Sequence, residues 1–71
     1  MDLIKIGKYI AEKRKALGLT QKQLAEKLNM SDKSVSKWER GICLPDVSIY
    51  MELCSILRIS INEFLALHKP M

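Results

Sequence analysis

The stretch from 21 to 40, QKQLAEKLNMSDKSVSKWER, decides how this chain folds. Its apolar residues recur at helical spacing on both sides of Asn29, and a small residue, Ala25, follows the first of them. Asn tolerates the left-handed backbone of a tight turn better than most residues do. A small residue lets two helix backbones approach, so that apolar residues from both helices meet beneath the turn. The stretch therefore predicts two short helices, 20–28 and 31–40, that cross steeply.

Three further short helices are expected outside this stretch, over 6–17, 47–58 and 61–67. An apolar stripe at helical spacing runs along the first of them, and Gly18 ends it by accepting a left-handed backbone. Side chains that cap helix N-termini open the other two: Asp46 and Ser60. Five short helices with tight connections predict an all-α, compact bundle.

Length and composition exclude several classes of protein. The chain has 71 residues, which allows one domain over 1–71, and 48% of them are apolar, which excludes a disordered tail. A chain this short buries only roughly 60% of its unfolded surface, so little scaffold remains for a deep catalytic pocket. The sequence also lacks a paired base and nucleophile, a phosphate-binding loop and a cluster of metal ligands. We therefore expect no enzyme, no cofactor and no metal.

Charge and cysteine content point to a partner and a compartment. Lys and Arg number 12 against 8 Asp and Glu, a net charge of +4 that suits a polyanionic partner. No apolar run approaches the roughly 18 residues of a membrane span, and no signal peptide is expected. Cys43 and Cys54 lie in unrelated contexts and His68 is the one histidine, so the thiols fit a reducing cytoplasm. Pro70 and Met71 are expected to be loose.

The segment 21–40 and its flanks resemble the helix-turn-helix of the phage repressor and Cro family, often called the XRE type. The flanks that carry the resemblance are KRKALGLTQKQLAEKL, VSKWERG and the following Pro-Asp, and the likeness extends from Ile6 to Leu65. Two positions depart from the family pattern, which usually has Gly in place of Asn29 and often Ala in place of Cys54. The resemblance implies a five-helix domain that binds double-stranded DNA.

The helix predicted over 31–40 has one polar face. At about 100° per residue, one arc holds three cations, while Val35 and Trp38 point the opposite way. An α-helix fits the major groove, where each base pair presents a distinct pattern of donors and acceptors. We expect four residues of the arc to contact base edges: Asp32, Lys33, Ser36 and Lys37. The alternative is an ordinary solvated helix face.

Contacts to the DNA phosphates are expected beside these residues. The candidates are Gln21, Lys22, Ser31, Trp38 and Arg40. The role of Gln21 is implied by the family resemblance, and the alternative is a plain exposed residue in the first turn of its helix. Trp38 is expected to lie mainly in the core, with its indole N–H as the group that reaches a phosphate.

An ion pair is expected between the first helix and the helix over 31–40. Glu39 lies at the inner edge of its helix, and a partly buried charge needs an opposite charge nearby. Lys13 and Arg14 flank the apolar stripe almost symmetrically, so spacing alone does not choose between them. The family resemblance chooses Arg14 as the partner of Glu39, in a structural role.

These features predict a sequence-specific DNA-binding regulator of bacterial or phage type, a repressor that reads a two-fold operator as a homodimer. The alternative, from a different class, is an antitoxin-type module that binds a partner protein and uses DNA binding for autoregulation. Apolar residues of the last helix exceed what one core face requires: Ile61, Phe64, Leu65 and Leu67. They are expected either to form the dimer surface or to complete a small core.

Overall fold

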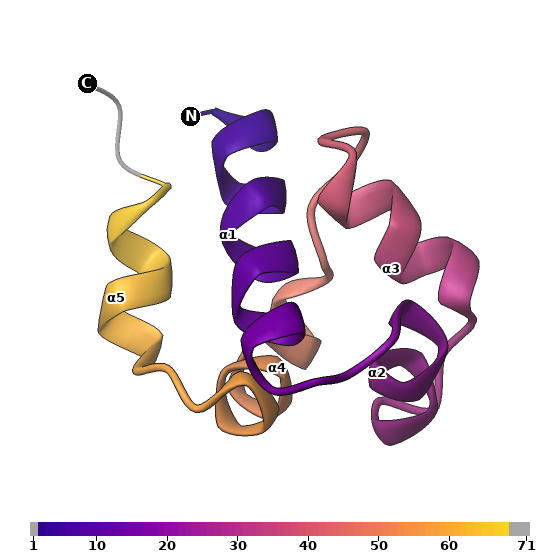
Figure 1. The fold of residues 1–71 in the computed structure, drawn as a ribbon. Coiled ribbons are helices and arrows are strands. Elements are labelled where there is room, and N and C mark those ends of the chain that lie inside the picture. The colour runs from indigo at the N-terminus through magenta and orange to yellow at the C-terminus, as the bar shows by residue number, and fades with distance from the viewer. Residues whose placement is uncertain (1, 69–71) are drawn as a thin grey trace.

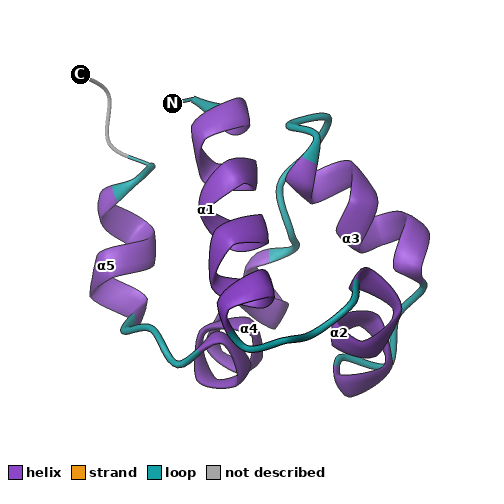
Figure 2. Ribbon diagram, in the orientation of Figure 1, coloured by secondary structure: helices purple, strands orange, loops and turns teal. Residues whose placement is uncertain are grey.

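The computed structural model describes residues 2–68, which form six short helical segments joined by loops (Figure 1). They are α1 (Leu3–Ala16), α2 (Gln21–Lys27), α3 (Asp32–Glu39), η1 (Val47–Ile49), α4 (Tyr50–Leu57) and α5 (Ile61–Ala66). Within that range the chain forms helices and loops and no strand, as Figure 2 shows, so the predicted all-α fold is confirmed. The expectation for Pro70 and Met71 falls outside the described residues.

Two helices start three residues away from the expected position, and the other bounds agree within one residue. α1 begins at Leu3, a turn before the predicted start, because the Asp2 side chain accepts hydrogen bonds of 3.1 Å from the backbone N–H groups of Ile4 and Lys5. Asp46 does cap the next segment, but it opens the three-residue 3₁₀ turn η1 and not a continuous helix over 47–58. Its carboxylate accepts from the Ser48 N–H at 2.9 Å, and this backbone hydrogen bond lowers the pKa of Asp46.

The helices surround one core to which every one of α1 to α5 contributes. Its buried apolar side chains are Ile6, Ile10, Leu24, Ala25, Leu28, Val35, Trp38, Tyr50, Leu53, Cys54, Leu57 and Phe64. α3 packs against α1 and α2, and α5 packs against α4. In the view of Figure 1, α3 and α5 lie on opposite sides of α1. Phe64 is 0% exposed, so the prediction that it belongs to a dimer surface is wrong and it completes the core instead.

Gly7 fixes how closely α1 and α3 approach each other. A Cβ atom added at Gly7 would lie within 2.7 Å of the carbonyl oxygen of Glu39 and nearer still to that of Trp38. Both are backbone atoms at the end of α3, which a side-chain rotation cannot move. A glycine at this crossing therefore sets the distance between the first helix and the polar helix α3.

Candidate nucleic-acid interface

The turn between α2 and α3 has the geometry that the sequence predicts. Asn29 adopts φ 57°, the left-handed conformation expected of it, and its neighbour Met30 donates its backbone N–H to the carbonyl of Ala25 at 2.9 Å. Ala25 is buried where the two helices meet. Thr20 opens α2 with a full capping box, and the hydroxyl of Ser31 accepts from the Ser34 N–H to open α3. These local contacts fix the position of α3 relative to α2.

α3 divides into a buried side and a polar side. Val35 and Trp38 are buried in the core, with 0% and 4% of their surfaces exposed. The remaining side carries four residues of the predicted base-reading set, of which three are exposed and Ser36 is half-buried: Asp32, Lys33, Ser36 and Lys37. Arg40 follows directly and is exposed, with its Nε donating to the carbonyl of Ser36 at 3.4 Å. The structure therefore brings this predicted set onto one accessible helix face.

The ion pair between α1 and α3 is present. Arg14 donates from Nε to Oε2 of Glu39 at 2.7 Å and from Nη2 to Oε1 at 2.9 Å, a bidentate arrangement. Both side chains are nearly buried, with 9% and 6% of their surfaces exposed. The remaining Nη1 donates to the carbonyl of Leu19 at 2.7 Å, in the linker before α2. Lys13, the other candidate, instead holds its ammonium 5.4 Å from the centre of the Tyr9 ring.

Gln21 joins the same cluster, which the sequence did not indicate. Its Nε2 donates to Oε1 of Glu39 at 3.0 Å, so this one carboxylate links the first residue of α2 to α1 and to the end of α3. One amide hydrogen of Gln21 is therefore used within the protein, and the second amide hydrogen is the group of this side chain that could donate to a phosphate. Trp38 lies in the core, as expected, with 4% of its surface exposed. Lys22 and Ser31, two further phosphate candidates, are exposed.

The described residues were also compared with the requirements of a metal site and of a membrane-spanning helix. No group of three or more His, Cys, Asp or Glu side chains within 2–68 is placed to hold a metal ion. Within the same residues, no helix has the length and apolarity that crossing a bilayer requires.

With this geometry established, comparison with known proteins identifies the family. The family pattern described as helix-turn-helix matches residues 10–64, and the chain belongs to this family, in its phage-repressor type. It is 35% identical over 60 residues to the HTH-type transcriptional regulator ImmR of Bacillus subtilis, an alignment that covers 84% of this chain and 47% of ImmR. It is 37% identical over 60 residues to the cryptic phage CTXphi transcriptional repressor RstR of Vibrio cholerae, covering 84% of this chain and 54% of RstR. The chain thus spans about half the length of these relatives.

Solved structures agree with this assignment. The restriction-modification controller protein C.AhdI of Aeromonas hydrophila superposes with a TM-score of 0.79 at 32% identity, covering 89% of this chain and 91% of C.AhdI. The clp gene regulator ClgR of Corynebacterium glutamicum superposes with a TM-score of 0.81 over 93% of this chain and 70% of ClgR. At 24% identity the likeness to ClgR shows the fold alone. The family and fold expected from the sequence are therefore confirmed.

Proposed function

We propose that this chain is the DNA-binding domain of a sequence-specific transcription regulator that acts as a repressor. The observation that carries the proposal is the division of α3, whose Val35 and Trp38 anchor it in the core while its cations and Asp32 lie exposed on the other side. An anchored helix with an exposed polar face is what insertion into the major groove requires. Repression then follows from occupancy of a promoter, and it needs no catalysis.

Within this proposal the exposed residues divide into two roles. Lys33 and Lys37 donate to the O6 and N7 atoms of guanine, and Asp32 accepts from the N4 amine of cytosine. Ser36, which is too short for distant bases, contacts a thymine methyl group or a phosphate. The proposed phosphate contacts come from Gln21, Lys22, Ser31 and Arg40, and from the indole N–H of Trp38, whose ring lies in the core. The phosphate contacts supply the salt-dependent affinity, and the base contacts supply selectivity.

The proposed regulator works as a homodimer on a two-fold operator with half-sites about one helical turn apart. The proposed contact between copies lies on α5, where Leu65 is 43% exposed and Ile61 and Leu67 are half-buried. α5 lies across α1 from α3 (Figure 1), so contact through α5 leaves the polar face of α3 free. We place this protein in the bacterial cytoplasm, where its operator DNA lies.

Selection of bound duplexes from a random DNA library tests the proposal. We expect enrichment of a two-fold symmetric sequence, with observed affinity falling steeply as salt rises, by about 0.9 log units per log unit of salt for each phosphate neutralised. A fluorescence-anisotropy titration of the selected duplex at several salt concentrations measures that slope. No enriched sequence together with a flat salt response would exclude DNA reading and favour the protein-binding alternative.

A further inference from the structure

One oxygen of the Glu39 carboxylate accepts hydrogen bonds from two different helices. Oε1 accepts from Nη2 of Arg14 on α1 at 2.9 Å and from Nε2 of Gln21 on α2 at 3.0 Å. Only the first of these bonds belongs to the ion pair. The second reaches a half-buried side chain that we have proposed as a contact to a DNA phosphate, so the ion pair is connected to the proposed DNA surface through Gln21.

The carboxylate decides which end of the Gln21 amide faces the cluster. A carboxylate in an ion pair can only accept, so the nitrogen of the amide, and not its oxygen, lies toward Glu39. A primary amide nitrogen carries two hydrogens that point in different directions. Glu39 takes one of them, and the other remains for an acceptor outside the cluster. A phosphate oxygen of a DNA backbone is such an acceptor, because it has no hydrogen to donate.

Arg14 allows a carboxylate to lie close to the proposed DNA surface. An unpaired negative charge at this place would repel phosphates. The Arg14 guanidinium instead donates two hydrogen bonds to Glu39, and both side chains are nearly buried, with 9% and 6% of their surfaces exposed. The pair has no net charge, so Glu39 orients the amide of Gln21 without adding net negative charge to this surface.

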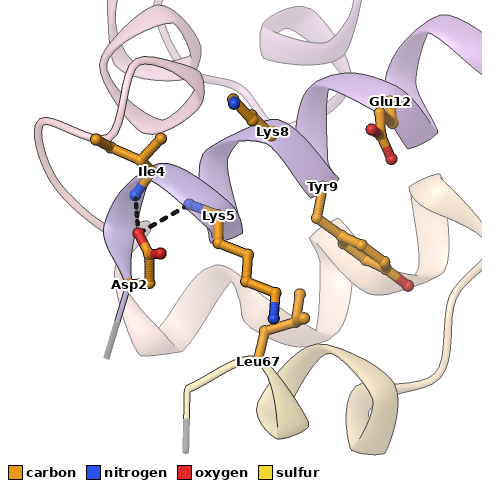
Figure 3. A pocket seen from close by; sticks show the side chains of 7 residues that line it. All are labelled: Asp2, Ile4, Lys5, Lys8, Tyr9, Glu12 and Leu67. Carbon is orange, nitrogen blue, oxygen red and sulfur yellow. Dashed lines mark hydrogen bonds between the residues drawn. The ribbon is translucent and has the colours of Figure 1, made fainter. Parts of the chain in front are cut away.

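The groups that hold Glu39 are themselves fixed. Arg14 donates a third hydrogen bond, from Nη1 to the carbonyl of Leu19 at 2.7 Å, in the linker that leads into α2. α1, which carries Arg14, is capped at its other end by Asp2, whose carboxylate accepts from two backbone N–H groups of the first turn (Figure 3). The backbone of Glu39 lies against Gly7 of the same helix. An amide held by such a support is ordered before any ligand arrives.

We propose that Glu39 and Arg14 are positioning residues for DNA binding, which hold the amide of Gln21 with its second hydrogen directed to a phosphate oxygen of the duplex. The inference rests on the proposed function and on Gln21 as a phosphate contact. A side chain that is already ordered loses no rotamer freedom on binding, which is worth about threefold to tenfold in affinity. Because phosphates carry no sequence information, this gain applies to every duplex alike.

The side-chain amide resonances of the full chain test the orientation of Gln21. The sequence has two glutamines, and Gln23 serves as the comparison, because its capping box uses the amide oxygen and not the nitrogen. In the free protein we expect one Gln21 amide hydrogen to exchange with water about threefold to tenfold more slowly than those of Gln23. On addition of the duplex selected from the random library, the resonance of the other Gln21 hydrogen should shift.

A paired replacement separates positioning from stability. Arg14→Met together with Glu39→Met exchanges the ion pair for apolar side chains of similar volume, and such exchanges of buried ion pairs are often neutral or stabilising. The replaced pair offers Gln21 no carboxylate oxygen. We therefore expect this variant to stay folded and to bind selected and random duplexes about threefold to tenfold more weakly than the parent, as measured by fluorescence anisotropy.

Gln21→Ala removes the proposed contact itself and should weaken binding by about tenfold. When it is added to the paired replacement, the total loss should be no larger than that of Gln21→Ala alone, because both changes remove the same contact. The matched control is Lys22→Ala, at the neighbouring position, whose exposed side chain lies outside the cluster. Its loss should add in full to that of the paired replacement.

The outcomes separate this inference from the proposed function. Additive losses from Gln21→Ala and the paired replacement, or a paired replacement that binds as tightly as the parent, would refute the positioning role while DNA binding stands. Equal exchange of the two Gln21 hydrogens in the free parent, or a second hydrogen that does not shift with the duplex, would refute it without any variant. A parent that binds no duplex would overturn both the proposed function and this inference.

Discussion

The guanidinium of Arg14 on α1 and the carboxylate of Glu39 on α3 form a nearly buried bidentate pair, with hydrogen bonds of 2.7 and 2.9 Å. Glu39 also accepts from Gln21, and Arg14 also donates to the carbonyl of Leu19, so the pair connects three helices and a linker. Among the described residues, no buried side-chain nitrogen or oxygen atom lacks a hydrogen-bond partner. Loss of either charge would leave the other buried without compensation, which is costlier than the loss of an exposed ion pair.

Arg14→Ala should therefore lower the free energy of unfolding by about 3–5 kcal/mol, with little change in which bases are preferred. The physical reason is that Glu39 stays nearly buried and loses the two charge-assisted hydrogen bonds that Arg14 donates. Urea denaturation measures the loss. Lys13→Ala is the control, because its ammonium lies over the Tyr9 ring and should cost about 0.5–1 kcal/mol. Equal stabilities of the two variants would show that the ion pair contributes no more than the contact of Lys13 with the Tyr9 ring.

Gly7→Ala should destabilise the domain and displace α3. A methyl group at this position meets backbone oxygen atoms at the end of α3, so relief requires the two helices to separate, at a cost of about 1–3 kcal/mol or more. Trp38 is the one tryptophan, and its emission should shift as the crossing opens. Gly18→Ala is the matched control, since it strains a φ of 72° but meets no atom within 4 Å. Its stability should fall while its Trp38 emission stays as in the parent.

Arg58→Gly should stabilise the protein. Arg58 ends α4 with φ 59° and ψ 42°, a left-handed conformation that costs a residue with a Cβ atom about 1 kcal/mol relative to glycine. Part of this gain is lost to the greater freedom of glycine in the unfolded chain, which leaves a net increase of about 0.5 kcal/mol in the free energy of unfolding. Arg58→Ala keeps the strain and removes the side chain, so it should show no gain. A gain of equal size in Arg58→Ala would assign the effect to charge.

The buried thiol of Cys54 should make stability depend on alkaline pH. Burial raises the pKa of this thiol above its ordinary value of 9.0, so the folded state favours the protonated form. Its contribution is complete below the pKa of the unfolded chain and is lost as pH rises through the folded value. The free energy of unfolding should therefore fall more steeply between about pH 8 and about pH 10 in the parent than in Cys54→Ala. Cys43→Ser, at an exposed thiol, should follow the parent curve.

Local patterns in the sequence predict much of this fold. The turn at Asn29 follows from the tolerance of asparagine for left-handed backbone, and the two sides of α3 follow from helical periodicity. Local patterns also account for the true start of α1, which was predicted too late. Asp2 is a residue that caps helices, and Leu3 is the first apolar residue of the stripe. Asp46 was identified as a cap, but capping alone does not distinguish a 3₁₀ turn from an α-helix.

Local sequence patterns do not predict contacts between segments that lie far apart in the chain. The importance of Gly7 depends on which backbone lies opposite it, and that backbone belongs to residues more than thirty positions further along the chain. Phe64 and Leu65 are adjacent and both apolar, yet one is in the core and the other is 43% exposed. The hydrogen bonds between Gln21 and Glu39 and between Tyr50 and His68 likewise require the tertiary arrangement. Arg14 and Lys13 were distinguished by family resemblance and not by spacing.

Lys37→Ala tests the proposed selectivity of α3 most directly. Lys37 is exposed on the polar face, where an ammonium that donates to guanine discriminates against other bases by about 1–3 kcal/mol. The variant should lose preference at one position of each half-site and keep the others, which competition between operator variants measures. Lys27→Ala removes the same charge from the end of α2, outside the predicted reading set, and should leave every base preference in place. Arg40→Ala should instead weaken all sequences alike and reduce the salt slope by about 1, as loss of a phosphate contact does. If Lys37→Ala behaves like Arg40→Ala, Lys37 contacts the backbone, and the bases are read by the other residues of the arc.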